Sequence, residues 1–169
     1  MKRTVWLWEL FGFAFVSLGG TLLHFLYDLL GGAVWIAAFS GVNESTWEHM
    51  KLLFWPMLIY LIFEYFFFKG YPAFVSVKLR GMLLGLALIP TVFYLYNGII
   101  GKSPDWINIS IFFISAAAVF IYETKALNSG KDFSPSPKAA AVCIACIAVL
   151  FAVFSFLPPE LAIFMEPAG

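Results

Sequence analysis

Two histidines stand near carboxylates in a sequence that is otherwise very apolar. His24 and Asp28 are four residues apart, so they share one face of a helix. Glu44, Glu48 and His49 form a second group that follows a short apolar segment. Two imidazoles and three carboxylates are a plausible ligand set for zinc or another divalent metal ion. We therefore predict a metal site with the ligands His24, Asp28, Glu48 and His49.

A catalytic metal site typically has three protein ligands and leaves one position for water. In such a site Glu44 would be the catalytic general base that activates this water. The zinc motif His-Glu-x-x-His does not occur in the sequence. Neighbouring residues on a helix point about 100° apart. Glu48 and His49 are therefore unfavourable as ligands of the same ion.

Further polar and aromatic side chains lie at the ends of neighbouring apolar stretches, and we predict that they bind a ligand. Each also has a structural explanation: Ser45 and Glu48 fit a capping box that begins a helix. The tyrosines and tryptophans fit an aromatic belt at the membrane surface, and His24 with Asp28 fits a hydrogen-bonded pair. The predicted ligand-binding residues are Tyr27, Asn43, Trp47, Lys51, Tyr94, Tyr96 and Asn97.

The composition indicates that membrane helices position these residues. The chain is 62% hydrophobic and 12% charged, with a mean hydropathy of +0.91. A typical soluble domain is roughly 45–50% apolar and about 25% charged. A water-soluble fold could not bury this much apolar surface, so the expected partner is the lipid bilayer. The net charge of zero gives no support for nucleic-acid binding.

Five apolar stretches are long enough to cross a bilayer, which takes about 20 residues in a helix. Long apolar runs without strict alternation favour helices over a barrel. We predict an all-α fold, a single transmembrane domain over 1–169. The segment from 31 to 45 is too short to span and is expected to be re-entrant or interfacial. The five spans are expected at about 5–30, 52–68, 81–100, 106–122 and 139–157.

The distribution of Lys and Arg predicts the orientation of the chain. With the N-terminus in the cytoplasm, all ten Lys and Arg residues except Lys51 and Lys102 fall on the cytoplasmic side. Five spans then place the C-terminus outside. The histidines and their neighbouring carboxylates are expected at the outer face.

The cytoplasmic half contains a second group of ionisable residues, namely Glu9, Glu64, Arg80 and Glu123. Ionisable groups inside a bilayer are costly and usually face the interior of the helix bundle. Glu64 and Arg80 flank the loop between the second and third spans. We predict that they form an ion pair that locks these two helices together.

Cys143 and Cys146 form a Cys-x-x-Cys pattern inside the last apolar run. In a soluble βαβ protein this spacing would indicate redox chemistry. Here no loop, basic neighbour or second cysteine pair accompanies it. We expect these cysteines to be buried and unreactive.

Several stretches resemble a family of small bacterial multi-pass membrane proteins of unknown function. The most specific are HFLYD at 24–28 and FSGVNESTWEHMKLLFWP at 39–56, with the patterns HFxYD and NESxWEHxK. The resemblance implies a bacterial origin and a plasma-membrane location. It also implies that the HFLYD and NESTWEH stretches belong to one functional unit, and it implies no activity. Further matching stretches are IFEY (62–65), RGMLLGLALIP (80–90), FYLYNGIIG (93–101) and PPELAIFMEP (158–167).

Three functions are compatible with these observations, and the sequence leaves open whether the protein is an enzyme. The first is a membrane-embedded hydrolase with a divalent metal ion at the outer face. This hydrolase would act on a lipid or peptide-like substrate. The second function is a protein that binds or transports a small molecule without metal, in an aromatic pocket. The third is a structural subunit or homo-oligomer, because Gly19-Gly20 and Gly81-x-x-x-Gly85 could pack closely against another helix.

Overall fold

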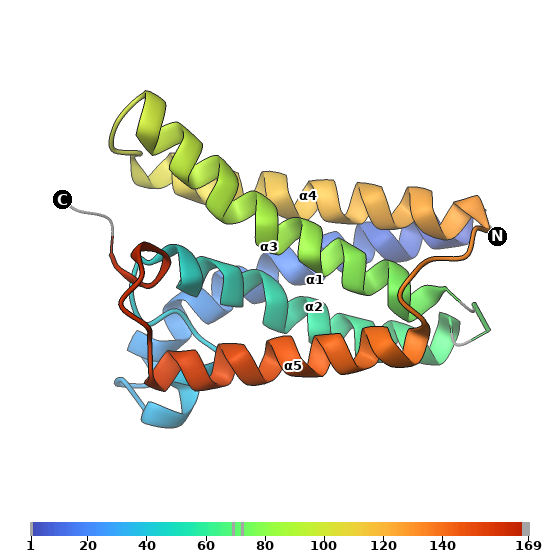
Figure 1. The fold of residues 1–169 in the computed structure, drawn as a ribbon, viewed down its shortest axis with the longest axis horizontal. Coiled ribbons are helices and arrows are strands. Elements are labelled where there is room, and N and C mark those ends of the chain that lie inside the picture. Colours follow the sequence, from blue (N-terminus) through green and yellow to red (C-terminus); the bar gives the residue numbers. More distant parts are fainter. Residues whose placement is uncertain (1, 69, 72, 167–169) are drawn as a thin grey trace.

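The computed structural model describes residues 2–68, 70–71 and 73–166 of the chain (Figure 1). All the described secondary structure is helical. Five α-helices are long and apolar enough to cross a membrane, which confirms the predicted five-helix fold. The helices are α1 (Lys2–Leu29), α2 (Thr46–Phe68), α3 (Phe74–Ile99), α4 (Asp105–Ser129) and α5 (Pro137–Phe156), with two 3₁₀-helices, η1 (Val34–Ala38) and η2 (Ala162–Phe164).

Local sequence signals account for where several helices begin and end. The α2 helix begins after Ser45, whose Oγ accepts a hydrogen bond from Glu48 N at 3.4 Å. This is one half of the expected capping box; in place of the other half, Ser45 N donates to Asn43 Oδ1. Ser136 caps α5 in the same way, and Pro137 occupies the first helical position. Gly130 ends α4 in the left-handed conformation, with φ of 64°. The short segment after the first span forms η1 and buries Ile36, Ala37 and Ala38.

The helices run back and forth along the long axis of the bundle (Figure 1). The α1 helix packs against α2 and α4, whereas α3 packs against α2, α4 and α5. One end of the bundle contains the end of α1, η1, the start of α2 and the end of α5 (Figure 1). We call this the histidine end, because His24 and His49 lie on these parts of α1 and α2. The start of α1 lies at the opposite end.

A single lysine connects four of the five long helices. The Lys78 Nζ atom on α3 lies 2.9 Å from Glu9 Oε1 on α1, 2.5 Å from Glu64 Oε2 on α2 and 2.7 Å from Glu123 Oε2 on α4. All four side chains are at most 3% exposed. We call these four residues the lysine cluster. Because each carboxylate belongs to a different helix, the ammonium group fixes how α1, α2 and α4 lie around α3.

The predicted ion pair between Glu64 and Arg80 is wrong. Arg80 is exposed, and its Nε donates a hydrogen bond to the Ser134 carbonyl oxygen at 2.8 Å. Its guanidinium lies 5.1 Å from the centre of the Phe133 ring. Residues two apart on a helix point about 200° apart, so only one of Lys78 and Arg80 faces the bundle interior, and it is Lys78.

The two glycines of Gly81-x-x-x-Gly85 serve packing within the chain. A Cβ atom at Gly81 would overlap the Glu123 carboxylate on α4. A Cβ atom at Gly85 would lie 2.5 Å from Leu53 Cδ2 on α2 and 2.9 Å from Val119 Cγ2 on α4. These glycines therefore let α3 approach both neighbours closely, and an external partner is not needed to explain them.

The α5 helix lies at the edge of the bundle and buries only Ala140, Ile144 and Phe151. Cys143 and Cys146 are free thiols on its exposed surface. The expectation that they are buried inside the protein is therefore wrong. In a membrane-spanning helix such a surface faces lipid, so the apolar run reflects lipid contact and not only packing in the core.

We predict that Lys78→Met destabilises the protein by about 3–5 kcal/mol, because removing one partner of a buried ion pair leaves uncompensated charge. The change is measured by heating purified protein in mild detergent and following tryptophan fluorescence. Arg80→Met is the matched control on the same helix and should change stability by less than about 0.5 kcal/mol. Equal stability of the two variants would contradict the structural role of Lys78.

Candidate functional site

The structure brings His24, Glu44 and His49 together at the histidine end. Glu44 Oε1 lies 3.7 Å from His24 Nε2, and Glu44 Oε2 lies 3.6 Å from His49 Nε2. The centres of the two imidazole rings are 6.0 Å apart. One carboxylate thus faces both imidazoles, through a different oxygen for each. These three residues come from α1, from the loop before α2 and from the first turn of α2.

Ser40 anchors the segment that connects these elements to α1. Its hydroxyl accepts a hydrogen bond from Tyr27 N at 2.9 Å and donates one to the Leu23 carbonyl oxygen. An undisturbed α-helix would join that N–H directly to that carbonyl. A side chain inserted at such a place locally opens a helix. The insertion lies next to His24 and therefore fixes the part of α1 that presents this imidazole.

Glu48 and Lys51 hold the loop in place and do not face the imidazoles. Glu48 Oε2 accepts a hydrogen bond from Val42 N at 2.9 Å and lies 2.7 Å from Lys51 Nζ. The Lys51 side chain is fully buried. Its Nζ also donates to the Ala37 carbonyl oxygen at 2.7 Å and to Ser155 Oγ at 2.9 Å. This ion pair therefore joins α2 to η1 and α5.

A backbone contact orients the ring of His49. Its Nδ1 lies 3.0 Å from the Ser45 carbonyl oxygen. A carbonyl can only accept, so Nδ1 carries the hydrogen in this contact. In the neutral ring Nε2 then has the free lone pair. This nitrogen is the one that faces Glu44, so it can accept a proton or a hydrogen bond there.

An apolar cavity of about 240 Å³ lies beside the two imidazoles, between α1, α2 and α4. We call it the histidine cavity. Among the side chains that line it, Phe25 and Ile109 are more than half exposed on the outer surface of the bundle. The cavity thus has two imidazoles and one hydroxyl group, that of Thr21, among apolar walls, and it lies near the lipid-facing surface. It is lined by Gly20, Thr21, His24, Phe25, His49, Leu52, Ile109, Phe112 and Phe113.

Asp28, Asn43 and Trp47 lie near this end without facing the two imidazoles. Asp28 is exposed, and its carboxylate makes no hydrogen bond or ion pair within the described part of the chain. Asn43 Oδ1 accepts a hydrogen bond from Ser45 N at 2.9 Å and shapes the turn before α2. The Trp47 ring packs 4.5 Å from the Phe151 ring and 4.6 Å from the Phe164 ring. Trp47 therefore connects α2 with α5 and η2.

The predicted binding residues at the end of α3 belong to the turn between α3 and α4. Asn97 Nδ2 donates to the Phe93 carbonyl oxygen at 2.8 Å, and Asn97 Oδ1 accepts from Ser103 N at 2.9 Å. Tyr94 is exposed and Tyr96 is half-buried. Asn97 thus stabilises a turn, and a role of Tyr94 and Tyr96 in binding stays a prediction.

The placement of the carboxylates bears on the predicted metal site. Within the described residues, no three or more His, Cys, Asp or Glu side chains are arranged to hold a metal ion. Glu48 is bound to Lys51, so Glu44 is the carboxylate that faces both histidines. We predicted Glu48 as a metal ligand and Glu44 as the general base, but it is Glu44 that lies beside the two imidazoles. A metal at this site stays a proposal.

Two features of the structure were not predicted from the sequence: the apolar walls of the histidine cavity and the role of Lys78. Phe112 and Phe113 looked like ordinary residues of an apolar span, and no local pattern marks them as cavity walls. The sequence does contain a signal that Lys78 is buried, because apolar residues flank it on both sides in the stretch FVSVKLRG. The helix that contains it begins at Phe74, seven residues before the span expected from 81.

We predict that Glu48→Gln costs about 3–5 kcal/mol of stability, because it leaves the buried ammonium of Lys51 without a counter-charge. Glu44→Gln is the matched control, since the Glu44 side chain is 62% exposed and surface changes usually cost less than about 0.5 kcal/mol. Chemical unfolding of both variants in mild detergent measures the difference. If Glu44→Gln were the more damaging change, the assignment of the two roles would be wrong.

Comparison with known proteins places the chain in a family. No curated protein and no solved structure matches it. One family model, described as a family of unknown function (DUF6512), matches residues 2–169. This match covers almost the entire sequence and agrees with the resemblance to a family of unknown function. The chain is therefore a multi-pass membrane protein that belongs to the DUF6512 family.

Proposed function

We propose that the protein binds an amphiphilic molecule of lipid-like chemistry at the histidine end. The apolar part of the ligand would occupy the histidine cavity, and its polar group would contact His24, Glu44 and His49. The observation that carries this proposal is the cavity itself, because two imidazoles line it together with aromatic and aliphatic side chains. Ligand sites typically combine apolar walls with a few polar groups in this way.

The chemistry of the polar end suits a headgroup that both donates and accepts hydrogen bonds. A neutral imidazole offers one donor and one acceptor, and an ionised Glu44 offers only acceptors. Both His49 nitrogens are oriented, since Nδ1 contacts the Ser45 carbonyl oxygen and Nε2 faces Glu44. Phe25 and Ile109 lie at the outer surface of the bundle, which supports entry of the ligand from the bilayer.

The charge distribution supports an orientation with the histidine end outside. The structure buries Lys51 and Lys78 in ion pairs, so neither acts as a free loop charge. Lys102 is then the remaining positive residue on the histidine side. Of the described residues, Arg80, Lys125, Lys131 and Lys138 belong to the start of α3, the end of α4, the loop after it and the start of α5, on the opposite side. This asymmetry favours a cytoplasmic N-terminus. Together with the family resemblance it supports a bacterial plasma membrane as the location.

We predict that an amphiphile stabilises the protein through the histidine cavity. The probes are dodecanoic acid, dodecylamine, dodecanol and dodecylphosphocholine, which share one chain and differ in the headgroup. Each is added to protein in lipid nanodiscs, and the thermal unfolding midpoint is measured. At least one probe should raise the midpoint, since a ligand that binds only the folded state stabilises it.

The variant Thr21→Trp fills the cavity and should abolish this stabilisation, whereas the exposed control Thr91→Trp on α3 should retain it. His24→Ala should weaken the response to the headgroup that binds best. The absence of any response to the four probes, or an unchanged response in Thr21→Trp, would refute the proposed site.

A divalent metal site is the second candidate, favoured by one observation. The Nε2 atoms of His24 and His49 lie within 3.7 Å of the same carboxylate, and two histidines with one glutamate are the zinc ligands of some hydrolases. In this version Glu44 is a ligand. The general base of a hydrolytic reaction would then have to be a group other than Glu44.

This second candidate predicts about one zinc or similar ion per chain in protein purified without chelators, measured by elemental mass spectrometry. The variants His24→Ala and His49→Ala should each lower the metal content, whereas Tyr94→Phe should leave it unchanged. Metal-free wild-type protein, or equal metal content in all variants, would end the metal hypothesis and leave the amphiphile site unaffected.

A further inference from the structure

We propose that the lysine cluster is a proton-binding site, reached through a cavity between α1 and α4. The site lies at the end of the bundle opposite the histidines and is independent of the function proposed above. Its ligand is a proton shared among Glu9, Glu64 and Glu123 around the ammonium of Lys78.

The charges of the cluster do not balance. Three carboxylates surround one ammonium, and all four side chains are at most 3% exposed. Full ionisation would leave two negative charges without counter-charge in an apolar interior, where unpaired ions are very costly. A proton on a carboxyl group removes one of these charges without requiring any change in the fold. The imbalance therefore points to a small positive ligand.

Among the side chains that the structure describes, no second ammonium or guanidinium group forms an ion pair with these carboxylates. Lys78 Nζ lies 5.6–5.7 Å from the ring centres of Tyr60, Phe74 and Phe120, so aromatic faces complete its surroundings. The Tyr60 hydroxyl donates to the Trp8 carbonyl oxygen at 2.6 Å. The α5 helix also packs against α3, but it contributes no hydrogen bond or ion pair to the cluster within the described residues.

Several carboxylate oxygens in the cluster have no hydrogen-bond partner. Glu9 Oε2, Glu64 Oε1 and Glu123 Oε1 are buried and unpaired within the described part of the chain. Buried polar atoms in native proteins are nearly always paired. A protonated carboxyl group becomes a hydrogen-bond donor, and its neighbours here still have free acceptor oxygens. One proton would therefore satisfy both its own group and an adjacent one.

A proton fits this place better than a metal ion. Lys78 Nζ stands 2.5–2.9 Å from one oxygen of each glutamate and so occupies the centre that a metal would need. Protons need no such central position, because they bind directly to a carboxylate oxygen.

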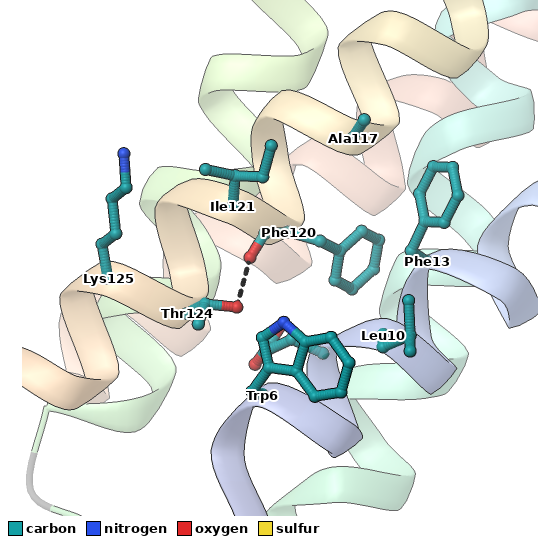
Figure 2. Close-up of a pocket in the computed structure, with 9 residues that line it drawn as sticks. Trp6, Leu10, Phe13, Ala117, Phe120, Ile121, Thr124 and Lys125 are labelled. Carbon is teal, nitrogen blue, oxygen red and sulfur yellow. Dashed lines mark hydrogen bonds between the residues drawn. The ribbon is translucent and has the colours of Figure 1, made fainter. Parts of the chain in front are cut away.

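A cavity of about 300 Å³ has Glu9 in its lining and includes no other member of the cluster. It lies between α1 and α4 and reaches Glu9, with Trp6, Phe13 and Phe120 among its walls (Figure 2). Thr124 and Lys125 add polar groups to the lining. Figure 2 shows the Lys125 side chain extending away from the aromatic walls. Glu9 is therefore the member of the cluster through which protons would enter and leave.

Infrared difference spectroscopy of the full chain in lipid nanodiscs tests the site. The wild-type protein should show the carbonyl stretch of a protonated, buried carboxyl group, and this band should disappear as the pH is raised. At least one of Glu9→Gln, Glu64→Gln and Glu123→Gln should remove the band, whereas Glu44→Gln should keep it. Absence of the band in wild-type protein over the whole pH range would overturn the proposal.

The proposed route is tested by hydrogen–deuterium exchange of the same carboxyl band. Ala117→Phe places a ring in the cavity and should slow the exchange, while Ala118→Phe, at the next position of α4 and outside the cavity lining, should not. Equal exchange rates would overturn the route through this cavity. The pH dependence of the wild-type band and the exchange measurement both keep the three glutamates, so they test the proposal even if a glutamine variant fails to fold.

Discussion

The interaction on which the structure most depends is the ammonium group of Lys78 bound by carboxylates from three other helices. In lipid, helices gain little from hiding apolar surface against one another, so specific packing and polar contacts decide which helices associate. A lysine alone inside the bilayer would be costly, and each of the three glutamates would be as well. Their mutual attraction therefore penalises any arrangement that separates α1, α2, α3 and α4. The close approach of α3 at Gly81 follows from the same constraint, because a Cβ atom there would overlap the Glu123 carboxylate.

A second buried lysine has a comparable role at the histidine end. Lys51 is satisfied by one glutamate, one backbone carbonyl and one serine hydroxyl, so its charge is balanced and its donors are used. This closed network holds η1 and the loop before α2. Glu44 is free of that network, and for this reason its exposed carboxylate can face His24 and His49. Glu48 is paired with Lys51, whereas the Glu44 carboxylate faces the two imidazoles. For this reason we place function at the imidazoles.

The apolar runs were sufficient to predict five helices, because a bilayer admits few other structures. The first residues of α2 and α3 were harder to predict. Polar residues at 46–51 and 77–80 lower the hydropathy there, although each helix includes these positions. The choice between Lys78 and Arg80 as partner of Glu64 required the helical phase of α3, which follows only once its start at Phe74 is known. That Glu44, and not Glu48, faces the imidazoles depends on the loop conformation, including the insertion of Ser40 into α1. No rule based on residue spacing contains that information.

One relation between the two clusters is nevertheless contained in the sequence. The interval between Glu9 and His24 on α1 has the same length as the interval between His49 and Glu64 on α2. On two antiparallel helices this equal spacing brings Glu9 level with Glu64 and His24 level with His49. The glycine contacts agree with this register, because Gly12 meets Tyr60 and Gly19 meets Pro56. A rise of 1.5 Å per residue separates the two levels by about 22 Å, less than the hydrocarbon core of about 30 Å. The polar groups of α1 and α2 therefore form two separate layers, and each layer needs partners from both helices to be tolerated in lipid.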